Sequence, residues 1–132
     1  MRTTVVRIGV ILLTATLGAS GASTQQVRLK GVMQLKLQHA QHILGDVVTS
    51  DWATLEADTS ALQKATRDPA WAVLTTPEYI RHTMIFTRAV EDLRDAAVHH
   101  DLESAPLAYV SLTLSCVQCH RYVARMRIAA KP

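Results

Sequence analysis

The chain has 132 residues, of which 48% are hydrophobic and 19% are charged, a length and composition that predict one small globular domain. Its formal net charge is +3. No basic stripe is interleaved with aromatic residues, so the sequence argues against a nucleic-acid partner. The sequence also contains no internal repeat, no low-complexity segment and no alternating strand pattern, which excludes repeat, disordered and β-rich folds.

The first 22 residues are typical of an export signal. Two arginines precede a short apolar stretch, Ile8–Leu17, and small residues follow it. The segment Ser20-Gly21-Ala22 fits the cleavage rule, so we expect residues 1–22 to be removed and residues 23–132 to form a periplasmic domain. An uncleaved membrane anchor is the alternative, but the apolar stretch is well short of the roughly 20 residues that span a bilayer.

Two helical patterns follow in the first half of the mature chain. Val27–Thr49 has apolar residues at three- and four-residue steps, which predicts an amphipathic helix with polar residues, Asp46 among them, on its other faces. A second helix is predicted over Trp52–Thr66, between the capping cluster Thr49-Ser50-Asp51 and Asp68-Pro69, because the residue before a proline avoids the helical region. The apolar positions of the first pattern are Leu29, Val32, Met33, Leu37, Ala40, Ile43, Leu44 and Val47.

Two further helices are predicted in the second half. The connection Asp68–Thr76 contains apolar residues and is expected to fold back over one end of the helices. Thr76-Pro77-Glu78 is a strong helix start, and that helix runs to about His99. The fourth helix runs over about Ala105–Ile128, with Ser104 as its expected cap. Four amphipathic helices with short or medium links predict an all-α fold, an antiparallel four-helix bundle. The apolar stripes are Tyr79, Ile80, Phe86, Val90, Leu93 and Ala97 in the third helix, and Leu107, Val110, Leu114 and Val117 in the fourth.

The second half of the fourth helix contains Cys116-Val117-Gln118-Cys119-His120, which has the C-x-x-C-H form that attaches c-type haem. The two thiols add across the haem vinyl groups, and the adjacent histidine supplies a nitrogen to the iron. A disulfide is the alternative in an exported protein, but it leaves His120 without a role. A thioredoxin-like redox pair needs a βαβ context, which this sequence does not show. A zinc site needs further ligands, and no second Cys/His pair has suitable spacing. We therefore expect one covalent haem c, held by Cys116 and Cys119, with His120 as the proximal ligand.

An exported four-helix chain with C-x-x-C-H close to its C-terminus resembles the class II c-type cytochromes, the family of cytochrome c′ and cytochrome c556, whose architecture is a four-helix bundle. The resemblance covers about Leu29–Ile128. In that family the first helix supplies the residue over the distal haem face: methionine in electron carriers, a non-ligating residue in proteins that bind small gases. Lys30-Gly31-Val32-Met33 resembles the stretch that ends at the ligating methionine, with Leu29 where the family often has arginine. The resemblance therefore implies that Met33 ligates the iron.

Two histidines compete with Met33 as distal ligands. Helix geometry turns His39 about 240° and His42 about 180° away from Met33, so they point elsewhere if Met33 faces the haem. An open or water-filled distal site is a further alternative. Weaker candidates lie on another helix or on the helix of His120 itself: Met84 and Met126. The remaining histidines are expected to be solvated: His82, His99 and His100.

The expected function is electron transfer by a monohaem cytochrome that meets periplasmic redox proteins. A thioether ligand from Met33 favours ferrous iron and raises the potential, which suits a carrier. The alternatives are a five-coordinate haem protein that binds or senses NO or CO, and a haem subunit that docks on a larger oxidoreductase. No acid–base constellation adjoins the motif, so an enzyme is not expected. Arg121 and Arg125, one and five residues after His120, are candidates to pair with the haem propionates. The resemblance also implies a homodimer formed through the first two helices.

Overall fold

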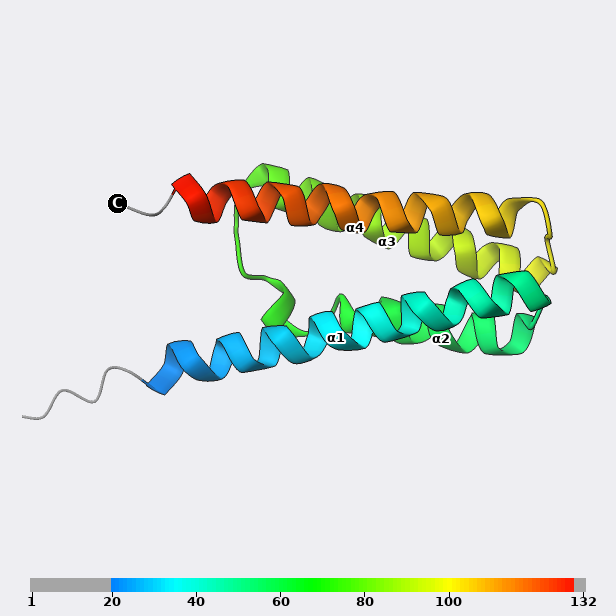
Figure 1. The fold of residues 1–132 in the computed structure, drawn as a ribbon, viewed down its shortest axis with the longest axis horizontal. Helices are drawn as coiled ribbons and strands as arrows, with labels where there is room; N and C mark the ends of the chain where they lie inside the picture. The colour runs from blue at the N-terminus through cyan, green and yellow to red at the C-terminus, as the bar shows by residue number, and fades with distance from the viewer. Residues whose placement is uncertain (1–19, 130–132) are drawn as a thin grey trace, which may run out of the picture.

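The computed structural model describes residues 20–129, so most of the predicted export signal, residues 1–22, lies outside the described part of the chain. This part forms four long helices and one short 3-10 turn: α1 Ser20–Thr49, α2 Trp52–Ala65, η1 Pro69–Trp71, α3 Pro77–His99 and α4 Ser104–Ala129. Consecutive helices run antiparallel, with α1 and α2 forming one layer and α3 and α4 the other (Figure 1). The predicted all-α, antiparallel four-helix bundle is therefore confirmed. Within residues 20–129, no helix has the length and apolar character needed to cross a bilayer.

The starts of α3 and α4 follow from capping chemistry. Thr76 caps α3, because its Oγ1 accepts a hydrogen bond from the backbone N–H of Tyr79 at 3.2 Å, and Pro77 occupies the first turn as predicted. The start of α4 differs from the prediction. The carboxylate of Asp101, rather than the hydroxyl of Ser104, accepts the free amides there, and the amide of Ser104 lies 3.0 Å from it. Local polar chemistry thus sets both helix boundaries.

The connection between α2 and α3 crosses from one helix layer to the other, at the end of the bundle where α1 begins and α4 ends (Figure 1). Trp71 is buried, and Val73 and Leu74 are partly buried against the core. The prediction that this segment folds back over one end of the bundle is confirmed. It therefore forms a wall at the end of the bundle that carries the cysteine motif.

The face that α4 turns toward the core is not its expected apolar stripe. All four residues of that stripe are at least half exposed: Leu107, Val110, Leu114 and Val117. The buried residues of α4 are instead mostly small: Ala105, Ala108, Leu112 and Ser115. Small side chains allow two helices to pack closely. The closely packed partner is α3, which adds three alanines to the same core: Ala89, Ala96 and Ala97.

Periodicity also placed other residues on the wrong face: some predicted to be buried are exposed, and some predicted to be exposed are buried. Leu37, Leu44 and Ile80, expected on inner faces, are each at least half exposed. Asp46 was placed on an outer face and His82 was expected to be solvated, yet they are only 8% and 6% exposed. The bundle therefore has ionisable groups on inner helix faces and apolar groups on outer ones.

Candidate functional site

A cavity of about 700 Å³ lies at the end of the bundle that the α2–α3 connection covers. Met33 of α1 and His120 of α4 both line it. Its wall is largely apolar, and it is formed by Leu29, Met33, Val73, Leu74, Tyr79, Cys119, His120, Val123, Ala124, Met126 and Arg127. The first and last helices thus bring the predicted distal and proximal residues to one cavity that is open on one side, although they lie far apart in sequence.

The cysteine motif lies within a continuous helix, α4. Cys119 lines the cavity, and Cys116, one turn earlier, is partly buried against the core. Both are free thiols in this structure. Burial raises the pKa of the Cys119 thiol, so this sulfur is protonated and uncharged at neutral pH. His120 borders the cavity and is itself exposed to solvent.

Lys36 occupies the inner face of α1, close to the position of Met33. Its Nζ lies 3.7 Å from the ring centroid of Trp71 and 3.9 Å from that of Phe86, which makes two cation–π contacts. Burial lowers the pKa of Lys36 from 10.5 to about 8, and the nearby thiols of the motif partly oppose this shift. The interior beside the motif therefore contains an amine that changes charge just above neutral pH.

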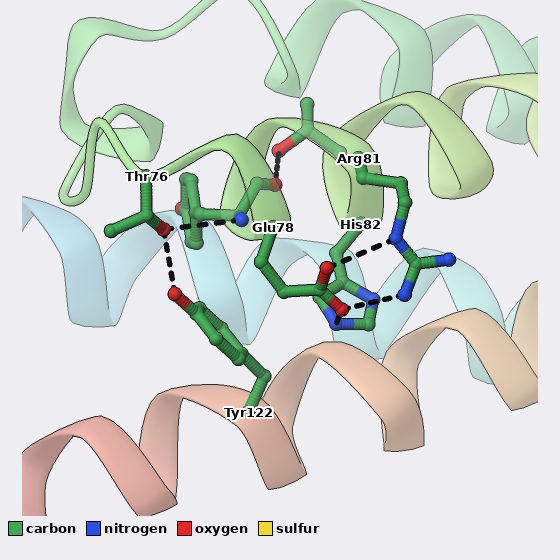
Figure 2. A network of polar contacts seen from close by, with 7 residues as sticks. Thr76, Glu78, Arg81, His82 and Tyr122 are labelled. Atoms are coloured by element: carbon green, nitrogen blue, oxygen red, sulfur yellow. Dashed lines mark hydrogen bonds and ion pairs between the residues drawn. The ribbon is translucent and has the colours of Figure 1, made fainter.

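A network of polar contacts joins the start of α3 to α4, two residues beyond the motif (Figure 2). The hydroxyl of Tyr122 lies 2.6 Å from Thr76 Oγ1, the same oxygen that caps α3. Glu78, in the first turn of α3, pairs with Arg81 and lies 3.3 Å from His82 Nε2. The buried ring of His82 in turn packs against Tyr122, with 5.5 Å between centroids. These contacts hold the motif-bearing part of α4 in a defined position against α3.

Tyr79, which forms the α3 side of the cavity, also anchors the connecting segment. Its hydroxyl donates a hydrogen bond to the backbone carbonyl of Trp71. Trp71 Nε1 in turn donates to Thr83 Oγ1 at 3.1 Å. Tyr79 was not predicted to be a site residue, because its position on the apolar stripe of α3 predicted only that it is part of the hydrophobic core. The hydroxyl at that position was the missed signal, since a buried tyrosine needs a hydrogen-bond partner.

The arginine that borders the cavity is not one of the two predicted from the motif. Arg121 and Arg125 are exposed and are not among the lining residues, whereas Arg127 lines the cavity. Arg127 follows His120 by two helical turns and therefore shares its face, while the other two arginines lie 100° or more around the helix. The signal in the sequence was the spacing of seven residues between His120 and Arg127, which places both on one face of a helix. The propionate-pairing role of Arg121 and Arg125 stays a prediction.

The competing histidines of α1 do not face the cavity. His39 Nδ1 forms a hydrogen bond with Asp58 Oδ1 at 2.8 Å, on the α2 side of α1, and His42 lies beside it. This confirms the prediction from helix geometry that both point away from the direction of Met33. Of the other methionines, Met84 is exposed on α3, and Met126 lines the cavity from α4, the helix of His120.

No protein-family model matches the sequence, and no curated protein matches it either. Two solved structures share the fold, both of them nitric oxide complexes of single-residue variants of cytochrome c prime from Alcaligenes xylosoxidans. The first has a TM-score of 0.65 and 17% identity, and the match covers 79% of this chain and 95% of that one. The second has a TM-score of 0.65 and 18% identity, with 77% and 94% covered. The likeness confirms the fold that the resemblance to class II cytochromes implied.

Proposed function

We propose that this protein is an exported c-type cytochrome that carries electrons between periplasmic redox proteins. Cys116 and Cys119 would hold one haem covalently, and His120 and Met33 would ligate its iron. The observation that carries the proposal is that Met33 and His120, from the first and last helices, line one cavity together with Cys119. The cytochrome c′ fold and the export-signal pattern of residues 1–22 support it independently.

The cavity suits a haem in size, polarity and donor set. Its volume of about 700 Å³ lies within the range of roughly 300–1,000 Å³ that is typical of cofactor sites. Imidazole and thioether are the ligand pair of electron-transfer c-type haems, and His120 and Met33 supply one of each. Arg127 is exposed, as Arg121 and Arg125 are, but it alone of the three lines the cavity, where its positive charge suits an anionic propionate. The residues present therefore fit the group.

The haem iron, when bound, supplies the one-electron redox chemistry. The chain contributes the environment that tunes this chemistry. Met33 offers a soft, neutral sulfur that favours the reduced iron and raises the potential. Apolar side chains line most of the cavity and would surround a bound haem, and the contact between Thr76 and Tyr122 holds α4 against α3 near the motif. A rigid, apolar site with two protein ligands suits rapid electron transfer.

A second candidate is a haem protein with an open distal site that binds nitric oxide or carbon monoxide. The observation in its favour is that both similar solved structures are nitric oxide complexes. In that case Met33 would be a wall residue of the cavity and not a ligand. The two candidates share the attachment site and differ only on the distal side.

Optical spectra of the haem-loaded protein test the proposal, recorded in both oxidation states with and without carbon monoxide. We expect a low-spin ferric spectrum and slow, weak carbon monoxide binding in the wild type. Met33→Ala should convert the ferric spectrum to high spin and make carbon monoxide binding rapid. Met84→Ala, which removes an exposed methionine from α3, is the matched control and should change neither. A high-spin wild type that Met33→Ala leaves unchanged would contradict the electron-carrier proposal and favour the gas-binding candidate.

A further inference from the structure

The interface between α1 and α2 holds a cluster of two histidines and one carboxylate, separate from the haem cavity. His39 and His42 lie one turn apart on α1, and Asp58 faces them from α2. His39 Nδ1 is 2.8 Å from Asp58 Oδ1, and His42 Nδ1 is 3.6 Å from Asp58 Oδ2. One potential ligand atom from each of the three residues lies within 4.8 Å of the others. Two helices thus bring two imidazoles and a carboxylate together at one point.

The carboxylate of this cluster is buried without a full set of partners. Asp58 is 8% exposed, and its Oδ2 accepts no hydrogen bond from residues 20–129. Asp46, one turn beyond His42 on α1, is also 8% exposed, and its Oδ2 is likewise unpaired there. Within the described residues, neither carboxylate forms an ion pair with Lys or Arg, so the site carries negative charge that a bound cation would offset.

We propose that His39, His42 and Asp58 bind a divalent transition-metal ion, with zinc as the best match to their chemistry. Zinc takes histidine nitrogen and carboxylate oxygen at about 2.0–2.2 Å, in a tetrahedron whose ligand atoms are then roughly 3.3 Å apart. His39 Nδ1 lies 2.8 Å from Asp58 Oδ1, and His42 Nδ1 lies 3.6 Å from the other oxygen, Oδ2, so both imidazoles approach the carboxylate at about this spacing. The ion would fasten α1 to α2, with its fourth position open to water and Asp46 adding a second negative charge nearby.

Titration of the intact protein with Zn²⁺ by calorimetry tests this site. We expect His42→Ala to weaken zinc binding by at least the roughly 10–100-fold that loss of a supporting residue costs at metal sites. The side chain of His42 is 55% exposed, so this variant should keep the fold, which circular dichroism checks. His39→Ala and Asp58→Asn should have the same effect on affinity. Binding should also weaken as the pH falls, because the histidines must lose their protons to bind the metal.

His99→Ala is the matched control for this titration. It removes a histidine from an exposed pair on α3, where His99 Nδ1 lies 3.4 Å from Asp95 Oδ1. We expect it to leave the zinc affinity unchanged. The proposal is overturned if the wild type binds no zinc, or if His42→Ala and His39→Ala bind zinc as tightly as the wild type does. Because no part of this test uses the haem, its failure would leave the electron-carrier proposal unaffected.

Discussion

The phenol oxygen of Tyr122 lies 2.6 Å from the hydroxyl oxygen of Thr76, and this contact joins α4 to the N-cap of α3. Tyr122 stands two residues after His120, and Thr76 stands three residues before Tyr79, which forms the α3 side of the cavity. One hydrogen bond therefore connects the helix that carries the cysteine motif to the helix that closes the cavity beside it.

Tyr122→Phe removes this hydrogen bond and keeps the aromatic ring. We expect the free energy of unfolding to fall by about 0.5–1.5 kcal/mol, the usual net contribution of one intramolecular hydrogen bond. Chemical denaturation measures the change. Tyr109→Phe is the matched control, because Tyr109 is partly buried on the same helix and its hydroxyl has no hydrogen bond within residues 20–129. Equal losses in the two variants would show that the contact with Thr76 contributes nothing.

Lys36 makes the stability of the haem-free chain depend on pH. Its pKa is about 8 in the folded chain, against an ordinary value of 10.5. Between these values the unfolded chain binds more protons than the folded one, so stability rises with pH across this window and the gain is absent below it. The total rise is on the order of 2 kcal/mol, allowing for partial screening by solvent. The free energy of unfolding of Lys36→Met, measured by chemical denaturation, should not rise with pH in this window. An equal rise in the wild type and in Lys36→Met would show that Lys36 is not its cause.

Asp46 has the opposite pH dependence. Its pKa is raised by burial and by Asp58, so the folded chain holds the proton more tightly than the unfolded chain does. Stability therefore falls as the pH rises through the folded pKa. Asp46→Asn should raise the free energy of unfolding at neutral pH by up to about 1 kcal/mol, and the gain should vanish in acid, where the native side chain is already neutral. Asp92→Asn, which removes an exposed partner of Arg88, is the control and should not stabilise the protein.

The haem is expected to form part of the hydrophobic core. A bound haem would fill the cavity of about 700 Å³ and contact its apolar wall, and the haem-free chain lacks these contacts. We expect the melting temperature of Cys116→Ser/Cys119→Ser, prepared without haem, to lie at least roughly 10 °C below that of the haem-loaded protein. Scanning calorimetry of both proteins measures the difference. Identical melting temperatures would mean that the cofactor does not fill the core.

Arg127 is expected to raise the reduction potential, because a nearby positive charge favours the reduced, less positive iron. Its replacement in Arg127→Gln should lower the potential by on the order of 40 mV, which corresponds to about 1 kcal/mol of electrostatic interaction. Arg125→Gln is the matched control, since Arg125 is exposed and does not line the cavity. A larger drop in the control would instead support the original assignment of Arg125 as the residue that pairs with a propionate.

The start of α3 was predictable because short-range chemistry determines it, whereas the start of α1 was not, since this helix begins at Ser20 and not at the expected Val27. The hydroxyl of Thr76 and the ring of Pro77 act within one turn, so the start of α3 depends little on the rest of the fold. The direction of His39 and His42 was predictable for a similar reason, since helix periodicity is a local property.

The core face of α4 was not predictable, because it depends on what the partner helix presents. α3 offers alanines at the shared interface, so α4 packs Ala105 and Ala108 there and leaves Leu107 and Leu114 outside. The inward position of Asp46 was missed for a related reason. A charged side chain counts as polar in any periodicity analysis, whereas its burial depends on the surfaces that neighbouring helices present.

Met33 and His120 lie roughly 90 residues apart in the chain, so an iron ligated by both would act as a cross-link. A bond that closes a loop of this length removes about 4–5 kcal/mol of conformational entropy from the unfolded chain, by the relation used for disulfides. The covalent attachment on α4 alone closes no such loop, because both cysteines and the histidine lie within one helical turn. The thioether of Met33 would therefore fasten the first helix to the last, and loss of that single bond would loosen the whole bundle.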